Sequence, residues 1–143
     1  MSGFDLRQSI ARLGYATPEP LPEWLEGPVQ AVLVDLQGER PVEIGLSYAA
    51  APIEDWGAVL VVEAGYERSG SSFGVEKTKR GAELLFQIAD GFQEQVFPEL
   101  HGSWGEARPE CPGHPHPAEP EIIDGEAWWI CPRDERPIKL IGS

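Results

Sequence analysis

Apolar residues recur along the first half of the chain with the spacing of β-strands. In residues 42–48, apolar and polar side chains alternate with a period of two, which is typical of a strand with one buried face. Residues 30–36 and 58–64 are short runs rich in valine and leucine, and we interpret both as strands. Residues 37–41 suit a hairpin, so the three predicted strands form an antiparallel meander, because parallel strands would need a long crossover.

Two other segments have the periodicity of helices. Residues 4–13 place their apolar side chains on one side of a short amphipathic helix, and four prolines make residues 17–28 an extended connector. Residues 76–97 predict a longer helix that ends at Pro98. Its apolar stripe consists of Leu85, Ile88, Ala89, Phe92 and Val96. We expect this stripe to cover the apolar face of residues 42–48, because neither surface is stable in water alone.

The last third of the chain contains many glycines and prolines. Residues 101–120 show no apolar periodicity, so something other than a regular element must order them. The tight-turn sequence Asp124-Gly125 separates residues 121–123 from residues 127–131 and predicts a β-hairpin. Residues 137–141 can add one more strand.

Four residues of this region form a ligand set for a metal. Cys111, His114, His116 and Cys131 supply two thiolates and two imidazoles, the donors that a tetrahedral structural zinc favours. His101 replaces His116 as a ligand if Pro115 directs the His116 imidazole away from the site. The competing interpretation is that the thiols are ordinary buried cysteines and that the His-Pro-His sequence is an exposed loop without an ion.

The ligand count favours a structural metal over a catalytic one. Locally the pattern resembles the second arm of a zinc ribbon, although Cys131-Pro-Arg-Asp lacks the second ligand of a paired knuckle. Four protein ligands leave no open coordination position for a substrate or a reactive water, and the zinc deaminase signature is absent from the sequence. We therefore expect one zinc ion as the cofactor and no catalytic residues.

These elements together predict an α+β fold. An antiparallel sheet is packed by one long and one short helix, and a zinc-stapled β-hairpin extends it at the C-terminus. A chain of 143 residues has the length of one domain. We expect residues 1–100 to form its core and residues 101–143 to form a metal-binding arm.

The charge balance narrows the classes of partner. Asp and Glu number 24 against 11 Lys and Arg, which gives a formal net charge of −13. Such a charge repels phosphate backbones and anionic lipids, so a basic protein is a more suitable partner than a nucleic acid or a membrane. The sequence contains no apolar run of 18 residues and no signal-peptide pattern. We therefore expect a cytoplasmic protein whose reduced cysteines are available to a metal.

One short segment departs from the acidic character of the chain. It is rich in serine and glycine and precedes the longer predicted helix, and its cations and backbone N–H groups are a candidate anion site. The residues of this candidate site are Ser69, Ser71, Ser72, Lys77, Lys79 and Arg80. It matches no phosphate-loop motif, and the competing interpretation is a mobile surface loop with solvated charges.

Trp128 and Trp129 are candidate partner-binding residues, because tryptophan is favoured at interaction hot spots. In a strand they point to opposite faces, so one enters the core while the other covers the metal loop or a partner. The function we expect is that of a small, acidic, non-enzymatic interaction protein with a structural zinc, such as an inhibitor or immunity-type protein for a basic partner. The alternatives are a small-ligand-binding protein or enzyme that uses residues 69–80, and a structural subunit of a larger complex.

Overall fold

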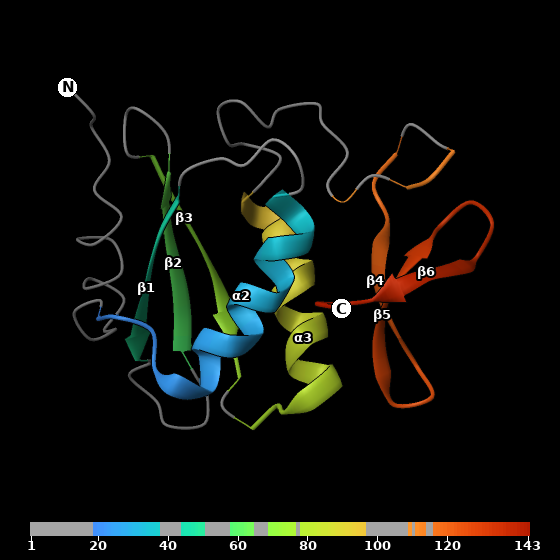
Figure 1. The fold of residues 1–143 in the computed structure, drawn as a ribbon. Helices are drawn as coiled ribbons and strands as arrows, with labels where there is room; N and C mark the ends of the chain where they lie inside the picture. Colours follow the sequence, from blue (N-terminus) through green and yellow to red (C-terminus); the bar gives the residue numbers. More distant parts are fainter. Residues whose placement is uncertain are drawn as a thin grey trace.

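In the part of the chain that the structure describes, two α-helices lie between two three-stranded antiparallel sheets (Figure 1). The structure is a computed structural model, and it describes residues 19–37, 44–50, 58–64, 69–76, 78–96, 109, 111–113 and 116–143. The helix predicted for residues 4–13 lies outside these residues. Neither described helix has the length and the uninterrupted apolar character that crossing a bilayer requires.

The elements follow one another as a helix, three strands, a second helix and three more strands. They are α2 (Glu23–Gln37), β1 (Ile44–Ala50), β2 (Ala58–Ala64), β3 (Ser69–Val75), α3 (Gly81–Gly91) with the π-helical turn η2 (Phe92–Val96), β4 (Glu119–Ile123), β5 (Glu126–Cys131) and β6 (Arg136–Leu140). The strand orders are β1-β2-β3 and β4-β5-β6, with antiparallel neighbours throughout. The predicted α+β class and an antiparallel three-stranded sheet are confirmed. The sheet is not built from the three predicted strands, and two element assignments are wrong.

The first wrong assignment concerns residues 30–36, which form part of α2 and are not a strand. The connector predicted for residues 17–28 is also too long, because residues 23–28 already belong to α2. The carbonyl oxygen of Pro22 accepts hydrogen bonds from the N–H groups of Leu25 and Glu26 at 3.0 Å each. The residues of α2 that become buried recur at helical spacing, and they are Leu25, Val29, Val32, Leu33 and Leu36. Pro28 inside a helix costs about 3 kcal/mol, whereas burying one such side chain contributes about 1.5 to 3 kcal/mol. Burial of five side chains therefore outweighs the proline.

The second wrong assignment concerns residues 69–75, which form the edge strand β3 and are not a loop. Serine and glycine give this segment little intrinsic strand preference. Alternation is nevertheless present at its end, where Phe73 and Val75 are buried and Gly74 between them is exposed. Pairing with β2 and the burial of these two side chains fix the strand.

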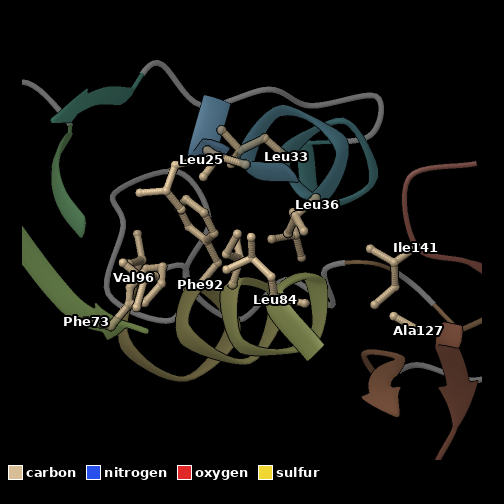
Figure 2. Close-up of a cluster of buried hydrophobic side chains, with 14 of the residues drawn as sticks. Leu25, Leu33, Leu36, Phe73, Leu84, Phe92, Val96, Ala127 and Ile141 are labelled. Atoms are coloured by element: carbon tan, nitrogen blue, oxygen red, sulfur yellow. The ribbon is translucent and has the colours of Figure 1, made fainter. Parts of the chain in front are cut away.

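The hydrophobic core lies mainly between α2, α3 and β3 and continues into the C-terminal sheet. Figure 2 shows Leu25, Leu33 and Leu36 of α2 facing Leu84 and Phe92. The ring of Phe92 meets that of Phe73 edge to face, with 5.2 Å between the ring centres. The stripe predicted for the longer helix is buried at Ile88, Ala89, Phe92 and Val96, and Leu85 is partly buried against the same core. Trp129 and Ile141 extend this core into the arm, so the arm shares the core of the helices.

Two helical glycines have opposite surroundings and predict opposite effects of alanine. An alanine Cβ at Gly91 would overlap the ring of Phe73, whereas the corresponding position at Gly27 has nothing within 4 Å. We expect Gly91→Ala to destabilise the protein by about 1 to 3 kcal/mol through overpacking. Gly27→Ala should stabilise it by about 0.5 to 1 kcal/mol, because alanine restricts the unfolded chain and favours the helix. Thermal unfolding of both variants tests this packing, and equal shifts of the two in one direction would contradict it.

Candidate metal centre

The first candidate ligand, Cys131, lies at the turn between β5 and β6. Cys131 is the last residue of β5 and is fully buried. Its carbonyl oxygen accepts a 2.7 Å hydrogen bond from the N–H of Glu135, which has a left-handed backbone with φ of 55°. The N–H groups of Arg133 and Asp134 donate to the Cys131 sulfur. The turn therefore directs its backbone donors at the Cys131 sulfur, an arrangement that favours the thiolate form that a metal requires.

The second cysteine lies on a loop that is closed by its own backbone. The N–H of Cys111 donates to the carbonyl oxygen of His116 at 3.1 Å, and the N–H of Ala118 donates to that of Pro109 at 2.8 Å. Gly113 permits the sharp turn, because its φ of 81° is strained for other residues. The loop thus returns to Cys111 after five residues and brings His116 beside it.

The two turns bring three potential metal ligands together. The ligand atoms of Cys111, His116 and Cys131 all lie within 4.8 Å of one another. Ligand atoms around a tetrahedral zinc are about 3.5 to 3.8 Å apart, so small side-chain adjustments would bring these three atoms to distances that one ion can bridge. Both sulfurs belong to fully buried residues, and the Nε2 atom of His116 is shielded from solvent. The group can therefore hold a metal ion.

The histidine is oriented in the way that metal ligands usually are. Nδ1 of His116 lies 3.3 Å from the carbonyl oxygen of Pro117. When Nδ1 carries the proton, it donates to this carbonyl, and Nε2 becomes the nitrogen with a lone pair for the metal. A hydrogen bond from the second ring nitrogen to a backbone carbonyl is a common support of metal-bound histidine.

The two thiols differ in acidity because of their surroundings. Burial, the hydrogen bond that the Cys111 thiol donates to Cys131 and the charge of Cys131 raise the pKa of Cys111 to about 11. Burial also acts to raise the pKa of Cys131, yet the donors from Cys111, Asp134 and Arg133 together lower it. Cys131 is therefore the more acidic thiol of the pair, and Cys111 keeps its proton to higher pH. A divalent cation would take the place of that proton and neutralise both sulfurs.

The remaining histidines of the predicted ligand set lie outside the described residues. His114 and His101 are both in this category, so the fourth ligand stays a prediction. His116 itself lies beside the two cysteines, whereas the alternative that His101 takes its place stays a prediction. The structure thus brings together three of the four predicted ligands.

A buried carboxylate joins the metal-binding arm to helix α2. Asp35, with a side chain only 3% exposed, accepts hydrogen bonds from Nε1 of Trp129 and Nζ of Lys139, both at 2.8 Å. It also accepts one from the backbone N–H of Gly142 at 2.7 Å. These donors come from β5, β6 and the C-terminal turn, so one side chain fixes three parts of the arm. Sequence patterns missed Asp35, because its partners lie about a hundred residues away.

The candidate partner-binding tryptophans have different environments. Trp129 is fully buried and bonds to Asp35, whereas Trp128 is partly exposed. The expected opposite orientation of the two side chains agrees with this difference. Trp128 is therefore the member of the pair that is partly accessible to solvent, and its role in binding a partner stays a prediction.

The serines of the candidate anion site lie in a strand. Ser69, Ser71 and Ser72 belong to β3, whose backbone pairs with β2. Lys77 lies outside the described residues. A loop spanning residues 69–80, on which this candidate site was built, is therefore replaced by a strand and a short link to α3.

The other two cations of that candidate site contact groups of the protein itself. Nζ of Lys79 lies 3.9 Å from a carboxylate oxygen of Glu76 and 3.6 Å from one of Glu83. The guanidinium of Arg80 lies over the ring of Trp24, 5.7 Å from its centre. Both cations therefore have partners within the protein, and the anion site stays a prediction.

Comparisons of the chain with protein-family models, with characterised proteins and with solved structures found no match. The function must therefore be inferred from the residues and the geometry described above.

Proposed function

We propose that this chain is a non-enzymatic interaction protein in which a structural zinc ion holds the C-terminal arm in place. The observation that carries the proposal is the cluster of Cys111, His116 and Cys131. Two thiolates and an imidazole suit zinc better than magnesium or calcium, which prefer oxygen ligands. His114 is the proposed fourth ligand, and four protein ligands are typical of structural zinc sites.

The position of the cluster explains what the metal contributes. Cys131 ends the strand that carries Trp129, and Cys111 lies on the loop that leads into β4. A metal between them joins the two ends of the β4–β5 hairpin at its open side. The hairpin buries Ala127 and Trp129 in the shared core, so the metal stabilises packing that the loop residues alone cannot provide.

We assign the acidic surface to the recognition of a basic protein. A net charge of −13 accelerates the encounter with a cationic partner and disfavours nucleic acids and anionic membranes. An inhibitor or immunity-type role is consistent with this charge, because such proteins mask the basic surface of a target.

Affinity capture with the zinc-loaded protein at low salt tests the interaction. We expect a stoichiometric protein partner with a basic contact surface, whose association rate falls steeply as salt screens the charges. The control is the same capture in 0.5 M salt, where the Debye length falls to about 4 Å. Recovery of acidic partners alone, or an association rate indifferent to salt, would contradict the proposal.

A further inference from the structure

One face of the C-terminal sheet, its inner face, packs against the helices. Trp129 and Lys139 are cross-strand partners, and both bond to Asp35 of α2. Ala127 and Cys131, which alternate with the outward positions of β5, are buried on the same side. This side of the sheet therefore packs on the helices and holds the metal ligand.

The outer face of the same sheet carries an aromatic ring between a carboxylate and an aliphatic side chain. Trp128 pairs with Glu121 on β4 and with Leu140 on β6, so the three side chains form one row across the sheet. Trp128 and Leu140 are partly exposed, and Glu121 is exposed. The neighbouring positions of this face are the exposed Glu119 and Glu126, the partly exposed Ile123 and the buried Ile130. We call these seven residues the outer face.

All the charged side chains of the β4–β5 hairpin are acidic. Between Ala118 and Pro132 the sequence contains four carboxylates and no lysine or arginine. Three of the carboxylates belong to the outer face, all of them exposed, and the fourth is Asp124 at the tip of the hairpin. The nearest cations along the chain, Arg133 and Arg136, lie in and after the next turn. A cationic ligand would therefore approach the β4 side of this face.

We propose that the outer face is the docking site for an arginine-bearing extended segment of the basic partner. This inference rests on the proposed function and gives it a location. Cross-strand neighbours have Cβ atoms about 5 Å apart, so one guanidinium can stack on Trp128 and pair with Glu121 together. Arginine suits this pair better than lysine, because its planar group both stacks on rings and binds carboxylates through two hydrogen bonds. A second copy of this chain would bring like charges together.

The test uses the full-length, zinc-loaded protein and a defined probe. The probe is a fluorescein-labelled peptide of alternating arginine and serine, and the control peptide has glutamate in place of arginine. We expect the arginine peptide to bind in fluorescence anisotropy and to shift the indole N–H resonance of Trp128. The indole N–H of Trp129 should not shift, because Asp35 already binds it inside the core.

Matched variants locate the site. Trp128→Ala should weaken binding about tenfold, since it removes the aromatic surface. The double variant Glu119→Gln/Glu121→Gln should slow association of the arginine peptide. The matched control is Glu23→Gln/Glu26→Gln on α2, which changes the net charge equally. Its dissociation constant should stay within about twofold of that of the unmodified protein. All four glutamates are exposed, so these substitutions remove charge without disturbing the core. The glutamate variants keep the test decisive if Trp128→Ala fails to fold.

The outcomes separate this inference from the proposed function. If the peptide binds but shifts other resonances, or if both glutamate pairs weaken it equally, the outer face is not the site, although a basic partner stays possible. If sedimentation shows a dimer that Trp128→Ala disrupts, the face binds a second copy and the inference is wrong. If the arginine peptide binds no better than the glutamate peptide at low salt, the proposed preference for a basic partner fails as well.

Discussion

Replacing Cys131 with serine is expected to remove the metal and to lower the melting temperature by more than about 10 °C. A ligand present at a thousand times its dissociation constant stabilises the native state by about 4 kcal/mol. For a domain of this size, each kcal/mol corresponds to about 3 to 4 °C. Cys111→Ser should have a similar effect, because both thiols belong to the same cluster. Elemental analysis and thermal unfolding of the two variants give the measurement.

The matched control for these substitutions is Ile141→Val in the same arm. Ile141 is buried in the core but is not part of the ligand cluster. This control should lose about 0.5 to 1.5 kcal/mol and keep its metal. A Cys131→Ser variant that keeps both its metal and its melting temperature would show that the cysteine is an ordinary core residue.

Asp35→Ala is expected to release the arm from α2 and to cost about 3 kcal/mol. The substitution leaves the buried indole N–H of Trp129 without its acceptor, and it removes the partner of two further donors. Loss of a hydrogen bond to a charged group costs about 1.5 to 3 kcal/mol. The contribution of Lys139 is small, because its side chain is 40% exposed and water replaces the ion pair. Thermal unfolding measures the loss, and the indole N–H resonance of Trp129 reports its cause.

Lys139→Met is the control that separates the ion pair from the buried hydrogen bonds. It should cost less than about 1 kcal/mol, because the lysine end of the pair is partly exposed and Asp35 keeps its hydrogen bonds from Trp129 and Gly142. Equal losses in Asp35→Ala and Lys139→Met would show that the ion pair dominates. A loss of metal in Asp35→Ala would further show that the metal cluster depends on how the arm packs on α2.

The C-terminal sheet was the most predictable part of the fold, because its signals are local. Asp124 and Gly125 have φ values of 50° and 80°, the left-handed conformations that a tight hairpin turn requires. β4 and β5 flank this turn as predicted, and β6 follows. The candidate ligands were also visible in the sequence, because few residue types bind zinc, and three of them lie together in the structure.

Helix α2 was predicted as a strand because residues 30–36, taken alone, do not show the helical spacing of its apolar side chains. Residues 30–36 alone look like a strand, since valine and leucine dominate and Pro28 stands just before them. When Leu25 and Val29 are included, the apolar side chains recur at helical spacing. The side chain of Val34 is 70% exposed, which agrees with a position on the outer side of the helix. Tertiary burial overrides the weak local preferences here.

The contacts that join distant parts of the chain had no sequence signal. Asp35 stands in an apolar run, and nothing nearby indicates that Trp129, Lys139 and Gly142 donate to it. Strand β3 was likewise hidden by its serines and glycines, which pair with β2 only in the folded sheet. Both features depend on tertiary packing rather than on local propensity.

Metal analysis of the purified, chelator-free protein tests the central claim most directly, when it is combined with thermal unfolding before and after metal removal. We predict about one zinc per chain, X-ray absorption with two sulfur ligands, and a melting temperature that falls on removal and recovers on addition of zinc. A protein that contains no metal, and whose melting temperature does not respond to added zinc, would contradict the account.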